Sequence, residues 1–94
     1  MLDVKINEKG DVILSGRFDA SQVEKAKPVF DDINTSKTVD FSNLEYISSA
    51  GLGVLLMTQK RLKDNGYQLI LKNMNKHIRE VFKYAGFDLI FQIE

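Results

Sequence analysis

Residues 40–56 read Asp-Phe-Ser-Asn-Leu-Glu-Tyr-Ile-Ser-Ser-Ala-Gly-Leu-Gly-Val-Leu-Leu. The first part alternates as the end of a strand does, a Ser-Ser-Ala-Gly turn follows, and a strongly apolar helix then begins. This order places the hydroxyl groups of Ser48 and Ser49 at the N-terminus of a helix, where backbone N–H groups lack partners and the helix dipole favours negative charge. A serine in this position can cap the helix, hold an anion or carry a phosphate.

The composition indicates a small globular domain without an obvious cofactor. The chain has 94 residues, which predicts one domain over residues 1–94. Thirteen basic and thirteen acidic residues cancel, so we expect no direct nucleic acid binding. Cysteine is absent and His77 is the single histidine, which excludes disulfides, thiolate metal sites and a histidine cluster. No stretch resembles a signal peptide or a membrane span, so we expect a cytoplasmic protein with no membrane insertion and no cofactor.

The N-terminal third predicts a hairpin followed by a helix. Residues 2–7 alternate as a strand, residues 8–11 form a turn, and residues 12–14 form a second strand that Gly16 stops. A helix over residues 21–33 follows, which begins late or breaks in two because of Pro28. Its N-cap is Asp19 or Ser21, and its apolar face consists of Val23, Ala26, Phe30 and Ile33.

The rest of the chain alternates strands and helices. This order predicts an α/β fold, in which helices pack on a mostly parallel or mixed sheet with an N-terminal hairpin strand. The expected elements are strands over residues 38–41, 68–72 and 89–93, a helix over residues 50–64 that ends at Gly66, and a helix from the Asn75 cap to Gly86.

The serine turn has two interpretations on local grounds. Helix caps are far commoner than switches, so a cap contributing about 1 kcal/mol is favoured. The alternative is a phosphorylation site, because a phosphate of about −1.5 to −2 charges is tolerated at a helix start and repels an acidic or apolar partner. Gly51 is expected to let the backbone turn tightly, and Gly53 to allow close packing or leave the surface open to a partner.

A second candidate lies at Asp19, which either caps a helix or brings an acidic group to the serine turn. Both loops leave the same edge of the sheet if the second and third strands run parallel, and that edge of open α/β sheets favours ligands and partners. No catalytic constellation is present: Gly-x-Ser-x-Gly is absent, and His77 reads as a solvated surface residue. The residues Met57, Met74, Phe82 and Phe87 are expected in the core or at its edge.

Several segments together resemble the STAS domain of bacterial anti-sigma factor antagonists. The resemblance covers nearly the whole chain. It rests on Gly16-Arg17-Phe18-Asp19, Val39-Asp40-Phe41-Ser42, Tyr46-Ile47-Ser48-Ser49-Ala50-Gly51-Leu52-Gly53-Val54-Leu55, Gly66, Leu69-Ile70-Leu71 and the pattern from Val81-Phe82 to Gly86-Phe87.

The resemblance implies a function. Antagonists of this family bind an anti-sigma factor that is also a serine kinase and so release a sigma factor; phosphorylation of a serine ends the binding, and a phosphatase restores it. The matching position here is Ser49, and Asp19 matches the acidic residue of the facing loop. The family's aspartate before this serine is Ser48, and its following hydroxyl residue is Ala50. The expected contact residues are Asp19, Ser48, Ser49, Gly51 and Leu52.

Two other functions stay open. A non-phosphorylated STAS subunit of a lipid-transport ATPase or of a signalling assembly fits Ser48 and Ala50 at least as well. An enzyme acting alone is disfavoured. The chain stops after its last expected strand, where many relatives continue into another helix. We expect this either to expose part of the sheet or to favour self-association as a homodimer.

Overall fold

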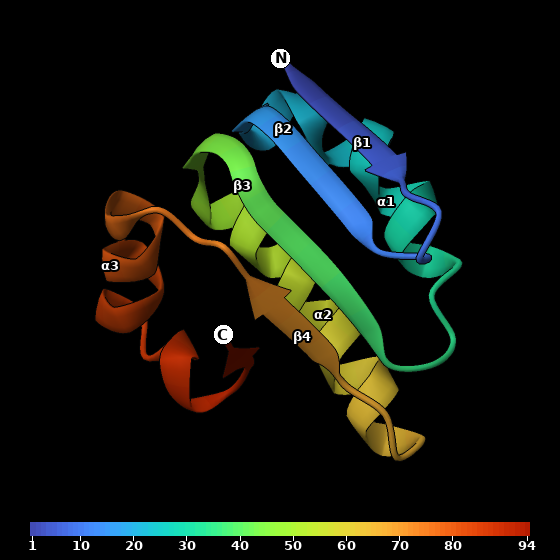
Figure 1. The fold of residues 1–94 in the computed structure, drawn as a ribbon. Coiled ribbons are helices and arrows are strands. Elements are labelled where there is room, and N and C mark those ends of the chain that lie inside the picture. Colours follow the sequence, from blue (N-terminus) through green and yellow to red (C-terminus); the bar gives the residue numbers. More distant parts are fainter.

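Five strands form one mixed sheet whose spatial order follows the chain, β1-β2-β3-β4-β5. The computed structural model describes all residues from 1 to 94. The first two strands are antiparallel, and every later neighbour is parallel, as the predicted hairpin and crossovers require (Figure 1). The strands are β1 (Leu2–Ile6), β2 (Val12–Phe18), β3 (Lys37–Ile47), β4 (Leu69–Lys72) and β5 (Gln92–Ile93).

Three helices complete the fold, and two of them cover one face of the sheet. The helices α1 and α2 lie side by side behind the sheet in Figure 1, whereas α3 lies beside it, next to the C-terminal segment. The helical segments are a 3₁₀ turn at Ala20–Gln22, α1 (Val23–Asp31), α2 (Ser49–Asp64), α3 (Lys76–Tyr84) and a 3₁₀ turn at Phe87–Leu89. The predicted α/β class and element order are confirmed. The break or late start expected from Pro28 is not observed, because α1 follows directly on the 3₁₀ turn and runs unbroken from Val23 to Asp31 with Pro28 inside it.

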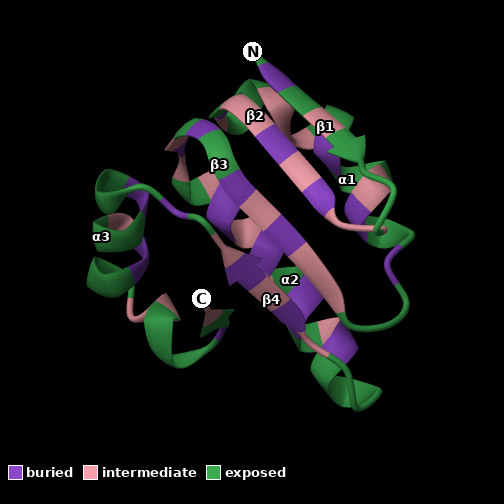
Figure 2. Cartoon of the chain, viewed as in Figure 1, coloured by how far each residue is buried: buried purple, intermediate pink, exposed green.

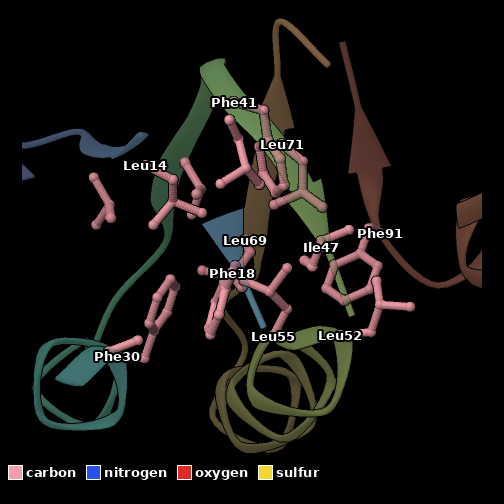
Figure 3. Packing of buried hydrophobic residues seen from close by; sticks show 14 of the residues in the cluster. Leu14, Phe18, Phe30, Phe41, Ile47, Leu52, Leu55, Leu69, Leu71 and Phe91 are labelled. Atoms are coloured by element: carbon pink, nitrogen blue, oxygen red, sulfur yellow. The ribbon is translucent and has the colours of Figure 1, made fainter. Parts of the chain in front are cut away.

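The core lies between the sheet and the two covering helices. Buried and partly buried residues alternate along β4 and the first half of β3, whereas beyond Phe41 two less buried residues separate each buried one (Figure 2). Phe30 of α1 and the α2 residues Leu52 and Leu55 point towards sheet residues such as Phe18 and Leu69 (Figure 3). The opposite face of the sheet is mainly polar, although it includes Ile13 and Ile70; its polar residues include Asp3, Lys5, Asp40 and Lys72.

Three predicted strand boundaries are wrong. The strand predicted over residues 38–41 runs from Lys37 to Ile47, directly up to the serine turn. The second strand does not stop at Gly16 but continues to Phe18, since Gly16 takes a φ of +92° at a shift in the sheet register. The last strand covers only Gln92–Ile93. The residues before it include a 3₁₀ turn at Phe87–Leu89. Phe87 and Phe91 pack against the ring of Phe82, at centroid distances of 6.3 and 5.7 Å.

The prediction for Met57 is also wrong, because its side chain is 71% exposed. The face of α2 that meets the sheet carries Leu55 and Leu62 together with the amide of Gln59. Gln59 is buried but satisfied: its Nε2 donates to the carbonyl of Ile90 at 2.9 Å, and its Oε1 accepts from the amide of Leu69 at 2.7 Å. None of the helices combines the length and apolar character needed to cross a membrane.

Candidate functional site

The C-terminal ends of β2 and β3 bring the two candidate loops together. The strands run parallel, so Asp19 and Ser48 follow them at the same edge of the sheet. The amide of Ser48 donates to the carbonyl oxygen of Phe18 at 2.9 Å, which ties one loop directly to the other. The prediction that the two loops leave the same edge of the sheet is therefore confirmed.

The two serines occupy different positions at the start of α2. Ser48 is the N-cap: its backbone is extended, with φ −91° and ψ 171°, and its Oγ accepts from the amide of Gly51 at 3.3 Å. Ser49 is the first residue of the helix, is exposed, and has a hydroxyl with no hydrogen-bond partner. The cap interpretation thus applies to Ser48 alone, and the hydroxyl of Ser49 is accessible.

Asp19 has both of the roles considered for it, as a cap and as an acidic group at this edge. Its Oδ1 accepts from the amide of Ser21 at 3.1 Å and from the hydroxyl of Ser21 at 2.5 Å, which caps the 3₁₀ turn. The hydrogen bond from the Ser21 side chain lowers the pKa of Asp19 below the usual value of 3.8 and outweighs desolvation, which acts in the opposite direction. The carboxylate is therefore charged at neutral pH.

Gly51 and Leu52 support this edge from beneath. A Cβ on Gly51 would lie 2.9 Å from Cγ1 of Ile47 and 2.9 Å from the carbonyl oxygen of Phe18, so close packing, rather than a tight turn, requires this glycine. Leu52 is 7% exposed and belongs to the core. A Cβ on Gly53 would meet nothing within 4 Å, which fits the expected open surface.

Sequence reasoning missed an apolar groove between α1 and α2. The groove has a volume of about 460 Å³ and begins at Ala50, next to Ser49. Two of its charged side chains pair with each other, since Nζ of Lys27 lies 3.0 Å from the carboxylate of Asp31. The exposure of Met57 could have been found from the helical period, because Met57 falls outside the stripe of leucines that faces the sheet.

A stacked pair on the polar face of the sheet was also missed. The guanidinium carbon of Arg17 lies 4.3 Å from the ring centroid of Tyr46. These residues come just before the two candidate loops, but they are 29 positions apart in the chain, and only the register of β2 and β3 makes them neighbours. Elsewhere, no group of three or more histidine, acidic or cysteine side chains is placed to hold a metal ion.

Comparison with known proteins identifies a family. Residues 4–92 match the family model described as "Mlab, STAS domain". BtrV of Bordetella bronchiseptica, described as a candidate anti-sigma factor antagonist, is 44% identical over 55 residues; the match spans 58% of this chain and 47% of that relative, about half of its length. The anti-sigma-B factor antagonist of Listeria monocytogenes is 23% identical over 101 residues, covering 99% of this chain and 89% of the relative.

Solved structures show the same fold. The anti-sigma factor antagonist SpoIIAA of Bacillus, in its unphosphorylated form, superimposes with a TM-score of 0.70 at 20% identity, over 100% of this chain and 87% of the other. A candidate anti-sigma factor antagonist from Thermotoga maritima gives a TM-score of 0.79 at 26% identity, over 99% and 85% of the two chains. Because the family model spans nearly all of the sequence and these folds agree, the chain belongs to the STAS domain family.

Proposed function

We propose that this chain is an anti-sigma factor antagonist of the partner-switching type. It binds a serine-kinase anti-sigma factor through the edge formed by the Asp19 and Ser48–Ser49 loops, and it thereby releases a sigma factor. Phosphorylation of Ser49 ends the binding, and a phosphatase restores it. The names of the relatives from Bordetella and Listeria support this function.

One observation carries the proposal. Ser48 supplies the helix cap, so Ser49 is left exposed on the first turn of a 16-residue helix with its hydroxyl unused. A kinase can reach such a hydroxyl without unfolding the domain.

The position of Ser49 makes a phosphate compatible with the fold but not with the complex. The unpaired N–H groups and the dipole at the start of α2 stabilise negative charge there. The same charge, added to the edge of the sheet that already carries the ionised Asp19, repels an acidic partner surface and is costly to bury against an apolar one. Phosphorylation therefore switches binding while leaving the domain folded.

The five expected contact residues have different roles in this proposal. Asp19, Ser48 and Ser49 face the partner, whereas Gly51 and Leu52 lie below them and fix the start of α2. The chain acts as a binding module rather than as an enzyme and requires no cofactor. We place it in the cytoplasm, with residues 1–94 as one domain, where it meets a kinase and a sigma factor.

Phosphate mapping tests the proposal. The purified chain is incubated with its kinase-type anti-sigma factor and ATP, and the product is mapped by mass spectrometry. We expect one phosphate, on Ser49, and none on a Ser49→Ala variant. Ser42→Ala is the matched control, because Ser42 is also exposed but lies away from this edge, and it should be modified like the wild type. Phosphate on another residue, or none with an active kinase, contradicts the switch.

A second function is favoured by the departures at Ser48 and Ala50, which remove a carboxylate and a hydroxyl that the family pattern contains. In this alternative the chain is a non-phosphorylated STAS subunit of a lipid-transport ATPase or of a signalling assembly, or a homodimer within one. Affinity purification discriminates between the two functions, because co-purification of an ATPase and a permease favours the alternative and co-purification of a kinase favours the proposal.

A further inference from the structure

The stacked pair of Arg17 and Tyr46 is a product of the sheet register. Gly16 of β2 pairs with Leu44 of β3, but the next residue, Arg17, pairs with Tyr46, so β3 has one extra residue, Glu45, at this point. With unbroken register Arg17 would lie opposite Glu45, and Phe18 opposite Tyr46. The irregularity therefore places a cation beside an aromatic ring on the open face of the sheet.

The same irregularity also aligns two core residues across β2 and β3. Directly after it, Phe18 pairs with Ile47, and both side chains are buried. Gly16 accommodates the shift through its positive φ, and the amide of Arg17 donates to the carbonyl oxygen of Met1 at 2.8 Å. The backbone of Arg17 is thus hydrogen-bonded to Met1, just before β1, and lies opposite Tyr46 of β3, so its position in the sheet is set by the fold.

The guanidinium of Arg17 stacks on Tyr46 but forms no ion pair with an acidic side chain. The three ion pairs of the structure involve other residues, and the Arg17 side chain donates no hydrogen bond, although it is exposed. Arg17 lies two residues before Asp19 in the chain. Its charge is the smallest of the contributions that lower the pKa of Asp19, after the hydrogen bonds from Ser21 and the charge of the N-terminus. Stacking on Tyr46 restricts the side chain, so less freedom is lost when its N–H groups bind a ligand.

These features together resemble an interface anchor. Arginine and tyrosine are enriched among residues that dominate binding energy, and a planar guanidinium matches a carboxylate through two parallel hydrogen bonds. We propose that Arg17, positioned by Tyr46, extends the binding edge formed by the Asp19 and Ser48–Ser49 loops. There it binds a carboxylate side chain of the kinase-type partner. This inference rests on the proposed function. It names the chemistry of the partner at one contact: an acidic residue of the partner lies beside the Ser48–Ser49 loop of this chain.

Titration calorimetry tests the inference, using the kinase-type anti-sigma factor that binds the wild-type chain. We expect Arg17→Glu to weaken binding by about tenfold or more, Arg17→Gln to weaken it less, and the salt dependence of the dissociation constant to become shallower in both variants. Lys83→Glu is the matched control, because it makes the same charge change at an exposed position on α3, and it should bind within about twofold of the wild type. Thermal unfolding of each variant establishes that the domain is folded.

A double-mutant cycle separates positioning from general stability. If Tyr46 acts by holding Arg17, Arg17→Gln should cost less in a Tyr46→Leu background than in the wild type. Additive effects, or binding by Arg17→Glu that equals binding by Lys83→Glu, overturn the inference. If Ser49→Asp abolishes binding while both Arg17 variants bind normally, the proposed function stands and this inference fails. If the wild-type chain binds no kinase-type partner, both fail.

Discussion

The adjacent serines at the start of α2 divide two tasks between them. Ser48 has an extended backbone, and its Oγ accepts a hydrogen bond from the amide of Gly51. Ser49 has an exposed hydroxyl that forms no hydrogen bond. The loss of a carboxylate at Ser48, compared with the family pattern, leaves a residue that caps the helix without adding charge. If Ser49 is the switch, as proposed, stability and switching are therefore separable by single substitutions.

Ser48→Ala should lower the free energy of unfolding by about 1 kcal/mol, because Gly51 loses its capping acceptor. Ser49→Ala is the matched control and should change it by less than about 0.5 kcal/mol, since its hydroxyl bonds to nothing. Urea denaturation at neutral pH measures both. An equal decrease in the free energy of unfolding for the two variants would show that Ser48 is not the N-cap of α2.

Asp19 predicts a pH dependence of stability. Its pKa is lowered in the folded protein, chiefly by the Ser21 side chain, so the unfolded chain binds the proton more readily. The stabilisation is fully present above the ordinary pKa of 3.8 and is lost as the pH falls through the lower, folded value. Asp19→Asn should therefore lose less stability than the wild type between pH 5 and about pH 3, as measured by urea denaturation at each pH. Parallel pH profiles would contradict this role.

At the level of single elements, α2 contains two glycines in opposite environments. Gly51 is buried against Ile47 and Phe18, with no room for a Cβ, whereas Gly53 faces open space. The sequence predicts that both need a reason, because glycine is unfavourable within a helix, but it cannot say which reason applies to which residue. That depends on the distance from α2 to the ends of β2 and β3, which only the folded chain defines.

Opposite effects are expected when each glycine is replaced by alanine. Gly51→Ala should destabilise the domain by about 1–3 kcal/mol through overpacking, since backbone and core atoms lie too close. Gly53→Ala should stabilise it by about 0.4–1 kcal/mol, because the helix gains a better helix former without a clash. The two midpoints of urea denaturation should therefore move in opposite directions. Shifts of the same sign would refute the assignment.

The elements were predictable to different degrees for physical reasons. The hydrophobic period and the capping signals predict α2 and α3 closely, since Ser48, Asn75 and Gly66 act locally. The last strand was overestimated because Leu89 ends a 3₁₀ turn and is exposed, and because Phe91 packs onto Phe82 instead of entering the ladder. Strand register, and with it the contact between Arg17 and Tyr46, is not encoded locally and could not be predicted.

Across the whole molecule, the C-terminal segment is attached mainly through aromatic packing. Phe82 contacts Phe41 of β3 as well as Phe87 and Phe91, with the rings in edge or T-shaped arrangements. The final strand adds only two residues to the sheet. The cluster therefore joins α3 and the end of the chain to the rest of the domain.

Phe82→Ala should lower the free energy of unfolding by about 3–5 kcal/mol, because it empties the centre of this cluster. Tyr84→Ala on the same helix is the control and should have little effect, since Tyr84 is 90% exposed. Guanidinium denaturation measures both. A small loss for Phe82→Ala would mean that α3 and the C-terminal residues contribute little to the cooperative fold.

The switch itself is tested by comparing one affinity in two states of the chain. The dissociation constant for the kinase-type anti-sigma factor is measured by titration calorimetry with unmodified chain and with chain carrying a phosphate on Ser49. We predict that the phosphate weakens binding at least about a hundredfold, roughly 2.7 kcal/mol, while the thermal midpoint of the domain stays nearly unchanged. Equal dissociation constants for the two states would show that the Ser49 edge is not a phosphorylation-controlled docking surface.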